Sequence, residues 1–362
     1  MYKKEAIQLI LKDMYKKGMR SGPVKNLYRL IIQSPPEGLV LMNPNIMAVK
    51  LDLEQVELLD MVVLGVVCGL FEMQWDMACP HCHGVADHSH DMSGLSTRSH
   101  CRSCKADFDN FADENITVAI SLNPALYEGQ APEPPERRTL DPRVRPVSAL
   151  ELIGAPLFRK YFSSQVPAVD QSVKIRSVTV LFTDLIQSTR LYNAMGDLQA
   201  YAFVKEHFDI LFSHIVHNAG GVIKTIGDAV MAVFREPVNA VRAAFELKIS
   251  VNRLFDQKGQ KKENYGLRVS ISNGTALIVN MNDVLDLFGT TVNVSARIIK
   301  FSEKDSVAAT PGITENKEVR EFLMREGIVI KSLNEKLKGF SGLNRIEVLS
   351  PKSKWFFRIK TE

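Results

Sequence analysis

The amino-acid sequence predicts an α+β protein in two parts. The first half is predicted to be an α-rich, helix-turn-helix-like unit followed by a zinc ribbon, and the second half a largely antiparallel sheet with helices. Three observations support this plan. The length of 362 residues suits two or three domains, the first half contains two C-x-x-C pairs, and the second half follows a strand, helix, strand, strand, helix, strand pattern.

The composition limits the classes of function. Apolar residues make up 45% of the chain, which supports packed domains, and 45 basic against 41 acidic side chains leave a net charge of only +4. A protein built mainly to neutralise nucleic-acid phosphates would be more basic, so nucleic acid is not an expected partner. The longest apolar run, Met61 to Phe71, falls short of the roughly 20 residues of a membrane-spanning helix. Because the N-terminus also lacks a secretory pattern, we expect a cytoplasmic protein without a membrane partner.

Residues 1–77 are predicted to form the helical, helix-turn-helix-like regulatory domain. Apolar residues at helical spacing over residues 3–17 predict an amphipathic first helix. A short helix from Ile46 to Lys50 and a longer one from Leu53 to Leu70 then follow each other as in a helix-turn-helix. The second of these has no arginine or lysine to read bases, so a structural or regulatory role is favoured over DNA binding.

Residues 78–125 are predicted to form the zinc ribbon. Cys79 and Cys82 form one C-x-x-C pair, and Cys101 and Cys104 form a second pair after eighteen intervening residues. Two such turns present four thiolates to one Zn²⁺ ion in a tetrahedron. A closed shell of four thiolates leaves no open position, so we expect one structural Zn²⁺ per chain. A strand is expected from Asn115 to Leu122.

Two alternatives to this zinc site remain open. One is that the cysteines are unconnected thiols in a flexible loop, and the other is that a nearby histidine replaces one of them in the metal shell. The histidines concerned are His81, His83, His88, His90 and His100.

Residues 126–170 are predicted to be a proline-rich linker with short helices. Five prolines lie among charged residues from Pro132 to Pro146, and residues 148–165 are expected to form the short helices. Residues 171–350 would then be the second folded domain, and residues 351–362 a C-terminal tail.

The second half alternates between strand and helix patterns. Two of the expected strands are joined by Gly227-Asp228, a two-residue turn with glycine in its first central position. The expected strands are Ser177–Phe182, Gly221–Ile226, Ala229–Phe234 and Leu267–Asn273, and the expected helices are Gln199–His217 and Val238–Leu254.

Two carboxylates occupy positions suited to a ligand. Asp184 ends a strand and Asp228 lies in the turn between two strands. Carboxylates placed in this way hold hard cations such as Mg²⁺ or Mn²⁺. Taken singly, each has a plainer explanation, since Asp184 can cap the following helix and Asp228 can be an ordinary turn residue.

Three separated motifs change this balance. They are F-T-D-L-x-x-S-T from Phe182 to Thr189, G-G-x-x-K-T-I-G-D-A-V-M-A-V-F from Gly220 to Phe234, and D-L-F-G-T-T-V-N-V-S-A-R from Asp286 to Arg297. In order and spacing they resemble the class III adenylate/guanylate cyclase catalytic domain. The resemblance implies a ferredoxin-like cyclase homology domain over about residues 178–348.

The resemblance implies a role for each matching residue. Asp184 and Asp228 match the aspartates that hold two Mg²⁺ or Mn²⁺ ions, and Leu185 matches a backbone-carbonyl metal ligand. Lys224 and Asp286 match the purine-reading pair, and their donor and acceptor suit adenine rather than guanine, so ATP is the expected substrate.

Three further positions match residues that act on the ribose and phosphates. Asn293 and Arg297 are four residues apart on an expected helix and so share a face. The resemblance implies that Asn293 orients the ribose and that Arg297 stabilises the α-phosphate transition state. Lys338 matches a lysine that neutralises the triphosphate, with Lys336 as a neighbouring candidate.

Together these matches predict an adenylate cyclase that converts ATP to 3′,5′-cyclic AMP and pyrophosphate. In the family the metal aspartates and the remaining residues come from different domains, so a chain with one copy is expected to act as a homodimer. Two alternatives are a catalytically weak nucleotide-binding signalling module and a nucleic-acid-binding regulator acting through the zinc unit.

The first half is also similar to an uncharacterised N-terminal domain found before some bacterial cyclases. It is expected to regulate the cyclase domain in response to an upstream signalling protein or a small molecule.

Overall fold

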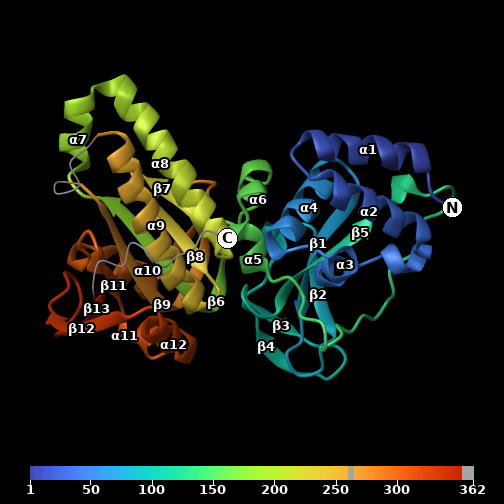
Figure 1. Cartoon of the computed structure of the whole chain (residues 1–362). Helices are drawn as coiled ribbons and strands as arrows, with labels where there is room; N and C mark the ends of the chain where they lie inside the picture. Colours follow the sequence, from blue (N-terminus) through green and yellow to red (C-terminus); the bar gives the residue numbers. More distant parts are fainter. Residues whose placement is uncertain (260–264, 353–362) are drawn as a thin grey trace. The chain divides into compact units, whose positions relative to one another are not determined.

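The computed structural model describes residues 1–259 and 265–352. The chain divides into two compact units, and the boundary does not follow the sequence strictly. The N-terminal unit contains Met1–Arg176 and also Leu277–Asp286, while the catalytic unit contains Ser177–Ala276 and the chain from Leu287 onward. Both units combine helices with sheets, so the predicted α+β class is confirmed (Figure 1).

Four helices begin the N-terminal unit: α1 (Lys4–Lys16), α2 (Ser21–Gln33), α3 (Pro44–Leu51) and α4 (Gln55–Val67). As its periodicity predicts, α1 is amphipathic and buries Ile7, Leu11 and Met14. The Asn43 side chain caps α3 by accepting a hydrogen bond from the Asn45 backbone N–H at 3.0 Å. Helix α2 is an element that the sequence analysis did not predict.

The end of α4 differs from the predicted end of the long apolar helix. The predicted helix extended to Leu70, but α4 ends at Val67 and Phe71 begins β1 (Phe71–Ala78). Gly69, at a φ of +80°, allows the chain to reverse after the helix. Phe71 then packs directly on Gly65 of α4, where a Cβ atom would lie 2.4 Å from the phenylalanine ring.

The N-terminal unit contains two small sheets. Strand β1 lies between β2 (Val85–Ser89) and β5 (Ile116–Leu122) in a three-stranded sheet, and β3 (Arg98–His100) pairs with β4 (Asp107–Asp109). The strand predicted from Asn115 to Leu122 is therefore present as β5. Short 3₁₀ helices complete the connections at Pro36–Leu39, Met92–Gly94 and Pro124–Leu126.

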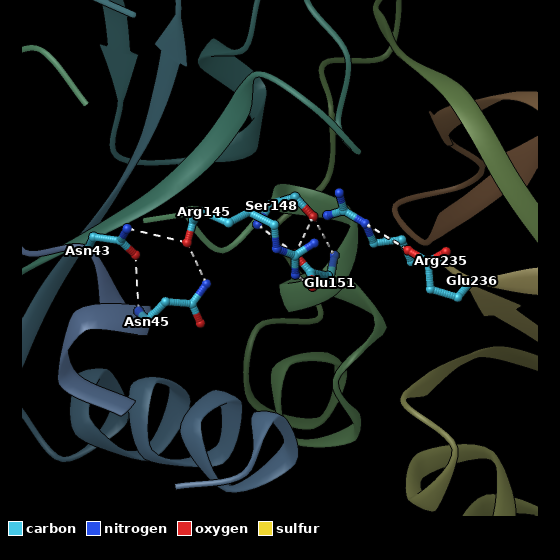
Figure 2. Close-up of polar contacts among 7 residues, drawn as sticks. All are labelled: Asn43, Asn45, Arg145, Ser148, Glu151, Arg235 and Glu236. Carbon is cyan, nitrogen blue, oxygen red and sulfur yellow. Dashed lines mark hydrogen bonds and ion pairs between the residues drawn. The ribbon is translucent and has the colours of Figure 1, made fainter. Parts of the chain in front are cut away.

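The segment predicted as a proline-rich linker makes specific polar contacts with this unit. Figure 2 shows the Asn43 and Asn45 side chains near Arg145, whose backbone carbonyl accepts hydrogen bonds from them at 3.4 and 2.7 Å. The Arg145 guanidinium pairs with Glu151, and Glu151 forms a capping box with Ser148 at the start of α5 (Ala149–Gly154). Helix α6 (Pro156–Tyr161) follows, so the predicted short helices are present.

The catalytic unit is built on a mainly antiparallel sheet. The strand order is β12-β13-β11-β9-β6-β8-β7, with β10 paired to β9, and β11 runs parallel to β9. The strands are β6 (Ser172–Leu185), β7 (Gly220–Ile226), β8 (Ala229–Phe234), β9 (Leu267–Asn280), β10 (Leu285–Phe288), β11 (Val307–Ala309), β12 (Ile328–Glu335) and β13 (Asn344–Pro351).

Helices pack on this sheet to form the core. They are α7 (Ser188–Met195), α8 (Asp197–His217), α9 (Pro237–Gln257), α10 (Thr290–Ile298), the 3₁₀ helix Ile299–Phe301, α11 (Pro311–Thr314) and α12 (Lys317–Arg325). Helices α8 and α9 lie side by side (Figure 1). They bury aromatic side chains such as Phe203 and Phe255 together with aliphatic ones. Every strand and helix predicted for residues 177–273 is present, and most extend beyond the predicted bounds.

None of the described helices has the length and apolar character needed to cross a membrane. The predicted tail, residues 351–362, lies outside the described residues from position 353 onward.

Candidate active site

Asp184 and Asp228 meet at one end of the central strands. Asp184 is the penultimate residue of β6, and Asp228 lies in the β7–β8 turn. The pairing of Ile226 with Ala229 makes this a two-residue turn, as predicted, and Gly227 adopts a φ of +61° that favours glycine. One carboxylate oxygen of Asp228 accepts a hydrogen bond from the Leu185 backbone N–H at 3.3 Å. The fold thus brings together Asp184, Leu185 and Asp228.

The electrostatics of this pair suit a divalent cation. Burial, together with the negative charge of Asp228, raises the pKa of Asp184. Two carboxylates and a backbone carbonyl are oxygen ligands, the type that Mg²⁺ and Mn²⁺ prefer, and a cation between the carboxylates would remove their repulsion. The residues present therefore fit the predicted metal site.

Arg268 is a residue of this site that the sequence analysis missed. Its Nη1 atom lies 3.4 Å from a carboxylate oxygen of Asp184, and both side chains are 38% exposed. The guanidinium opposes the rise in the pKa of Asp184. Arg268 is the one charged residue of the predicted strand Leu267–Asn273, and this was the signal that could have identified it.

Two more side chains beside the aspartates were missed. The Tyr192 hydroxyl of α7 is buried without a hydrogen-bond partner among the described residues, and burial raises its pKa. His207 of α8 is fully buried, and its Nε2 atom lies 3.2 Å from the backbone carbonyl oxygen of Asp228. Burial lowers the pKa of His207 to about 4, so its ring is neutral at physiological pH.

Lys224 and Asp286 lie in different compact units. Lys224 is half-buried on β7 opposite Met231, next to an irregularity in the β7–β8 pairing. Asp286 lies on β10 between the buried residues Leu285 and Leu287. It belongs to the segment grouped with the N-terminal unit, where Arg159 of α6 donates a hydrogen bond to the Leu285 carbonyl at 3.3 Å.

Arg297 lies against the segment that contains Lys338. Asn293 and Arg297 both lie on α10, as predicted, with Asn293 exposed and Arg297 half-buried. The Arg297 guanidinium lies 5.2 Å from the centre of the Phe340 ring, and its Nη1 atom is buried without a hydrogen-bond partner in the described chain. A Cβ atom on Gly339 would come within 2.9 Å of that nitrogen. A cationic nitrogen in this state is suited to an anionic oxygen.

Lys336 and Lys338 are both exposed, on either side of the buried Leu337. Lys338 is the lysine adjacent to Gly339, and Gly339 lies against Arg297. This position favours Lys338 over Lys336 as the lysine that acts together with Arg297.

The four cysteines of the N-terminal unit form a separate cluster. Their sulfur atoms all lie within 4.8 Å of one another, with Cys79 and Cys104 separated by 3.6 Å and Cys82 and Cys101 by 3.5 Å. Four sulfurs at the Zn–S bond length in a tetrahedron would be about 3.8 Å apart, so the cluster fits a zinc ion. Backbone N–H groups, that of Cys104 foremost, lower the pKa of Cys101 to about 6, whereas contacts with the other cysteines together with burial raise the pKa of Cys82 and Cys104.

The two C-x-x-C turns have the same backbone structure. In each, the N–H of the first cysteine donates to the residue five positions later, and the residue four positions later donates back to its carbonyl. The residues after the second cysteines, His83 and Lys105, both have positive φ, at 59° and 63°. Among the described residues this is the cluster whose ligand atoms converge, and it contains no histidine. The alternative of unconnected thiols is therefore not supported.

Comparison with protein families identifies both halves. The model of the adenylate and guanylate cyclase catalytic domain matches residues 171–341, and that of a family of unknown function, DUF5939, matches residues 5–176.

Several curated relatives match part of the chain. An uncharacterized protein of Mycobacterium tuberculosis is 32% identical over 167 residues, covering 46% of this chain and 38% of the relative. An adenylate cyclase of Streptomyces griseus is 30% identical over 140 residues, covering 39% and 32%. One of Anabaena cylindrica is 26% identical over 210 residues, covering 54% and 40%. The chain thus spans less than half the length of these relatives.

Among solved structures, the adenylyl cyclase CyaB from P. aeruginosa is 18% identical, with a TM-score of 0.44 over 51% of this chain and 98% of that chain. The family matches decide the assignment. The chain carries an adenylate and guanylate cyclase catalytic domain at residues 171–341, preceded by a DUF5939 domain of unknown function at residues 5–176.

Proposed function

We propose that this protein is an adenylate cyclase that converts ATP to 3′,5′-cyclic AMP and pyrophosphate. The observation that carries the proposal is the meeting of the Asp184 and Asp228 carboxylates beside the Leu185 backbone. Keeping two carboxylates ionised in a half-buried position is unfavourable without a cation, so the pair is suited to hold one. Adenylate cyclases among the relatives support the same reaction.

In the proposed reaction, the ribose 3′-oxygen forms a bond to the α-phosphorus and the 3′-hydroxyl proton leaves. The bond between that phosphorus and the oxygen bridging to the β-phosphate breaks, which releases pyrophosphate. Asp184, Asp228 and the Leu185 carbonyl would hold two Mg²⁺ or Mn²⁺ ions, whose chemistry would be to acidify the hydroxyl and to offset phosphate charge.

The side chains of α10 and of the following loop act on the rest of the nucleotide. Asn293 orients the ribose, and the unpaired Arg297 guanidinium nitrogen donates to the α-phosphate oxygens as their charge increases. Lys338, exposed beside Gly339, neutralises the triphosphate. Lys224 donates to N1 of adenine and Asp286 accepts from its 6-amino group, an arrangement that guanine cannot satisfy.

The active form is proposed to be a homodimer with two equivalent sites. The chain has one set of metal aspartates and one set of nucleotide-binding residues, and by resemblance to the family each site draws these sets from different chains. The N-terminal unit, stabilised by one structural Zn²⁺ ion, would regulate how two copies meet. Comparing the activity of the full chain with that of residues 166–362 over a range of protein concentrations tests this regulation.

A direct assay tests the reaction. Purified protein supplied with Mn²⁺ and ATP should release cyclic AMP and pyrophosphate in equal amounts, whereas an Asp184→Ala protein should release neither. An Asp209→Ala protein is the matched control, because Asp209 is an exposed residue of α8 outside the site. Equal product from the Asp184→Ala and unaltered proteins would reject the assignment, and a preference for GTP would correct the substrate.

A further inference from the structure

One polar side chain beneath the metal aspartates has no role in the proposed reaction. His207 of α8 is fully buried, and two phenylalanine rings lie beside it. Its ring is stacked on that of Phe203, with centroids 6.5 Å apart and planes 6° apart, and lies 5.6 Å from the Phe208 ring. It therefore lies in an apolar core where a polar ring has few possible partners.

The hydrogen-bonding state of His207 follows from its neighbours. The nearest partner of Nε2 is the Asp228 backbone carbonyl at 3.2 Å, and a carbonyl oxygen accepts but cannot donate. For this hydrogen bond to form, Nε2 must therefore carry a proton. The other nitrogen, Nδ1, is left as a buried acceptor with no hydrogen-bond partner among the described residues.

Histidine is not the residue that fold stability alone would favour at position 207. An unpartnered buried nitrogen carries a desolvation cost, and a phenylalanine would occupy the same aromatic surroundings without that cost. The histidine does provide one interaction that phenylalanine cannot, namely the hydrogen bond to Asp228.

The carbonyl that His207 holds belongs to a residue with few other restraints. Asp228 lies in the two-residue turn after Gly227, and residues 225–227 are exposed. The Asp228 side chain accepts from Leu185 N–H on one side, and its main chain accepts from His207 on the other. Together these two bonds fix both ends of the residue, so its carboxylate has a defined position relative to Asp184.

We propose that His207 is a positioning residue that holds the metal-binding carboxylate Asp228 in place from α8. The proposal rests on the proposed function of Asp184 and Asp228. It assigns His207 no contact with the substrate and no proton transfer. Groups that orient metal ligands in this way typically affect metal affinity by 10–100-fold when removed.

Substitutions at position 207 that differ in reach test the proposal. The His207→Gln amide nitrogen can reach the Asp228 carbonyl, whereas the shorter His207→Asn amide cannot, and His207→Phe removes the donor while filling the space. In zinc-loaded full-length protein, we expect half-saturation by Mn²⁺ to rise about tenfold in His207→Phe and His207→Asn. His207→Gln should stay within about threefold of the unaltered protein.

The same helix provides a matched control. His214 contacts Ser250 at 2.7 Å and Glu246 at 3.3 Å on α9, away from the metal aspartates. His214→Gln should therefore leave half-saturation by Mn²⁺ unchanged even if it lowers the melting temperature. Binding of Mn²⁺ is measured by the loss of its free electron paramagnetic resonance signal, and KM for ATP is measured alongside.

The outcomes separate this proposal from the proposed function. Equal Mn²⁺ affinity in the Gln and Asn proteins, or an unaltered affinity in a folded His207→Phe protein, would overturn the role of His207. A folded unaltered protein that binds Mn²⁺ through Asp228 but forms no cyclic AMP would reject the proposed function and leave the role of His207 supported or refuted by the binding data.

Discussion

Two groups of side chains in the described parts of the chain are suited to bind metal ions, and they differ in how complete each set of ligands is. In the N-terminal unit, four sulfurs lie within 4.8 Å of one another in two matching turns. In the catalytic unit, two carboxylates lie beside an arginine. Four thiolates would fill a tetrahedral shell, whereas two carboxylates and a backbone carbonyl would leave positions for water and substrate. A closed group of ligands can stabilise a fold, and an open group can take part in a reaction.

This difference predicts opposite effects from the same kind of substitution. Removing a ligand from the closed group should destabilise the unit that it holds together. Removing a carboxylate from the open group should relieve repulsion and leave the fold intact.

The largest effect is expected in the cysteine cluster. A Cys79→Ser protein should lose several kcal/mol of stability in the N-terminal unit, because zinc binding and folding of such a ribbon are coupled. Hydrogen exchange should show loss of protection around β2 to β4. The control is Cys68→Ser, since Cys68 lies outside the cluster. Unchanged protection in Cys79→Ser would show that the cluster is not structural.

The second effect concerns activity rather than stability. An Asp228→Asn protein should lose about a thousandfold in kcat, since one anionic ligand of the proposed metal site is gone. Its melting temperature should stay equal or rise, because the charge that raises the pKa of Asp184 is removed. Asp209→Asn serves as the control in the same melting and activity assays. A large loss of stability in Asp228→Asn would contradict the distinction between the two metal groups.

A smaller loss is expected for Arg297. The Arg297→Ala protein should lose about a hundredfold in kcat with little change in KM, as for an interaction made mainly in the transition state. Lys300→Ala, an exposed substitution just after α10, should retain activity. A change confined to KM would instead make Arg297 a ground-state binding residue.

The smallest effect concerns Lys248, a buried lysine of α9 that belongs to neither group of metal-binding side chains. Burial lowers the pKa of Lys248 to about 7, while its amine donates to the carbonyls of Leu267, Glu303 and Lys304. In the unfolded chain this lysine keeps its proton up to its ordinary pKa of 10.5, so stability should rise with pH between about 7 and 10.5. The slope would be at most about 1.4 kcal/mol per pH unit.

Urea unfolding at about pH 7, 8 and 9 measures that slope in the unaltered and Lys248→Met proteins. The substituted protein should be less stable at each pH, because the carbonyls around Lys248 lose their donor, and it should lack the slope due to Lys248. Parallel pH profiles would show that Lys248 keeps its proton in the folded state.

The sequence predicted those elements whose pattern depends on short-range periodicity. The β7–β8 hairpin was predicted closely, because Gly227 and the flanking apolar runs specify a local turn. Helix α2, strand β1 and the strands after α10 were missed, because their apolar residues match either type of element until tertiary packing decides. The end of α4 depends on Phe71 packing against Gly65, a contact that no local pattern encodes.

The candidate site shows the same division. The aspartates, Lys224 and the α10 residues belong to motifs that can be read along the chain. Arg268 and His207 reach the aspartates from β9 and α8, and only the fold brings them there. The grouping of Asp286 with the N-terminal unit could not be predicted either, because it depends on contacts such as that between Arg159 and Leu285.

The proposal that two chains share each site has a direct test. Alone, the Asp184→Ala protein should be inactive and the Arg297→Ala protein should keep only about one hundredth of the unaltered activity. If each site takes its aspartates from one chain and its arginine from the other, mixing them in equal amounts and allowing exchange should restore about one quarter of the unaltered cyclic AMP production. Half of the dimers would then be mixed, and each mixed dimer would contain one intact site. Production that stays at the level of the separate proteins, despite demonstrated exchange, would contradict the shared-site account.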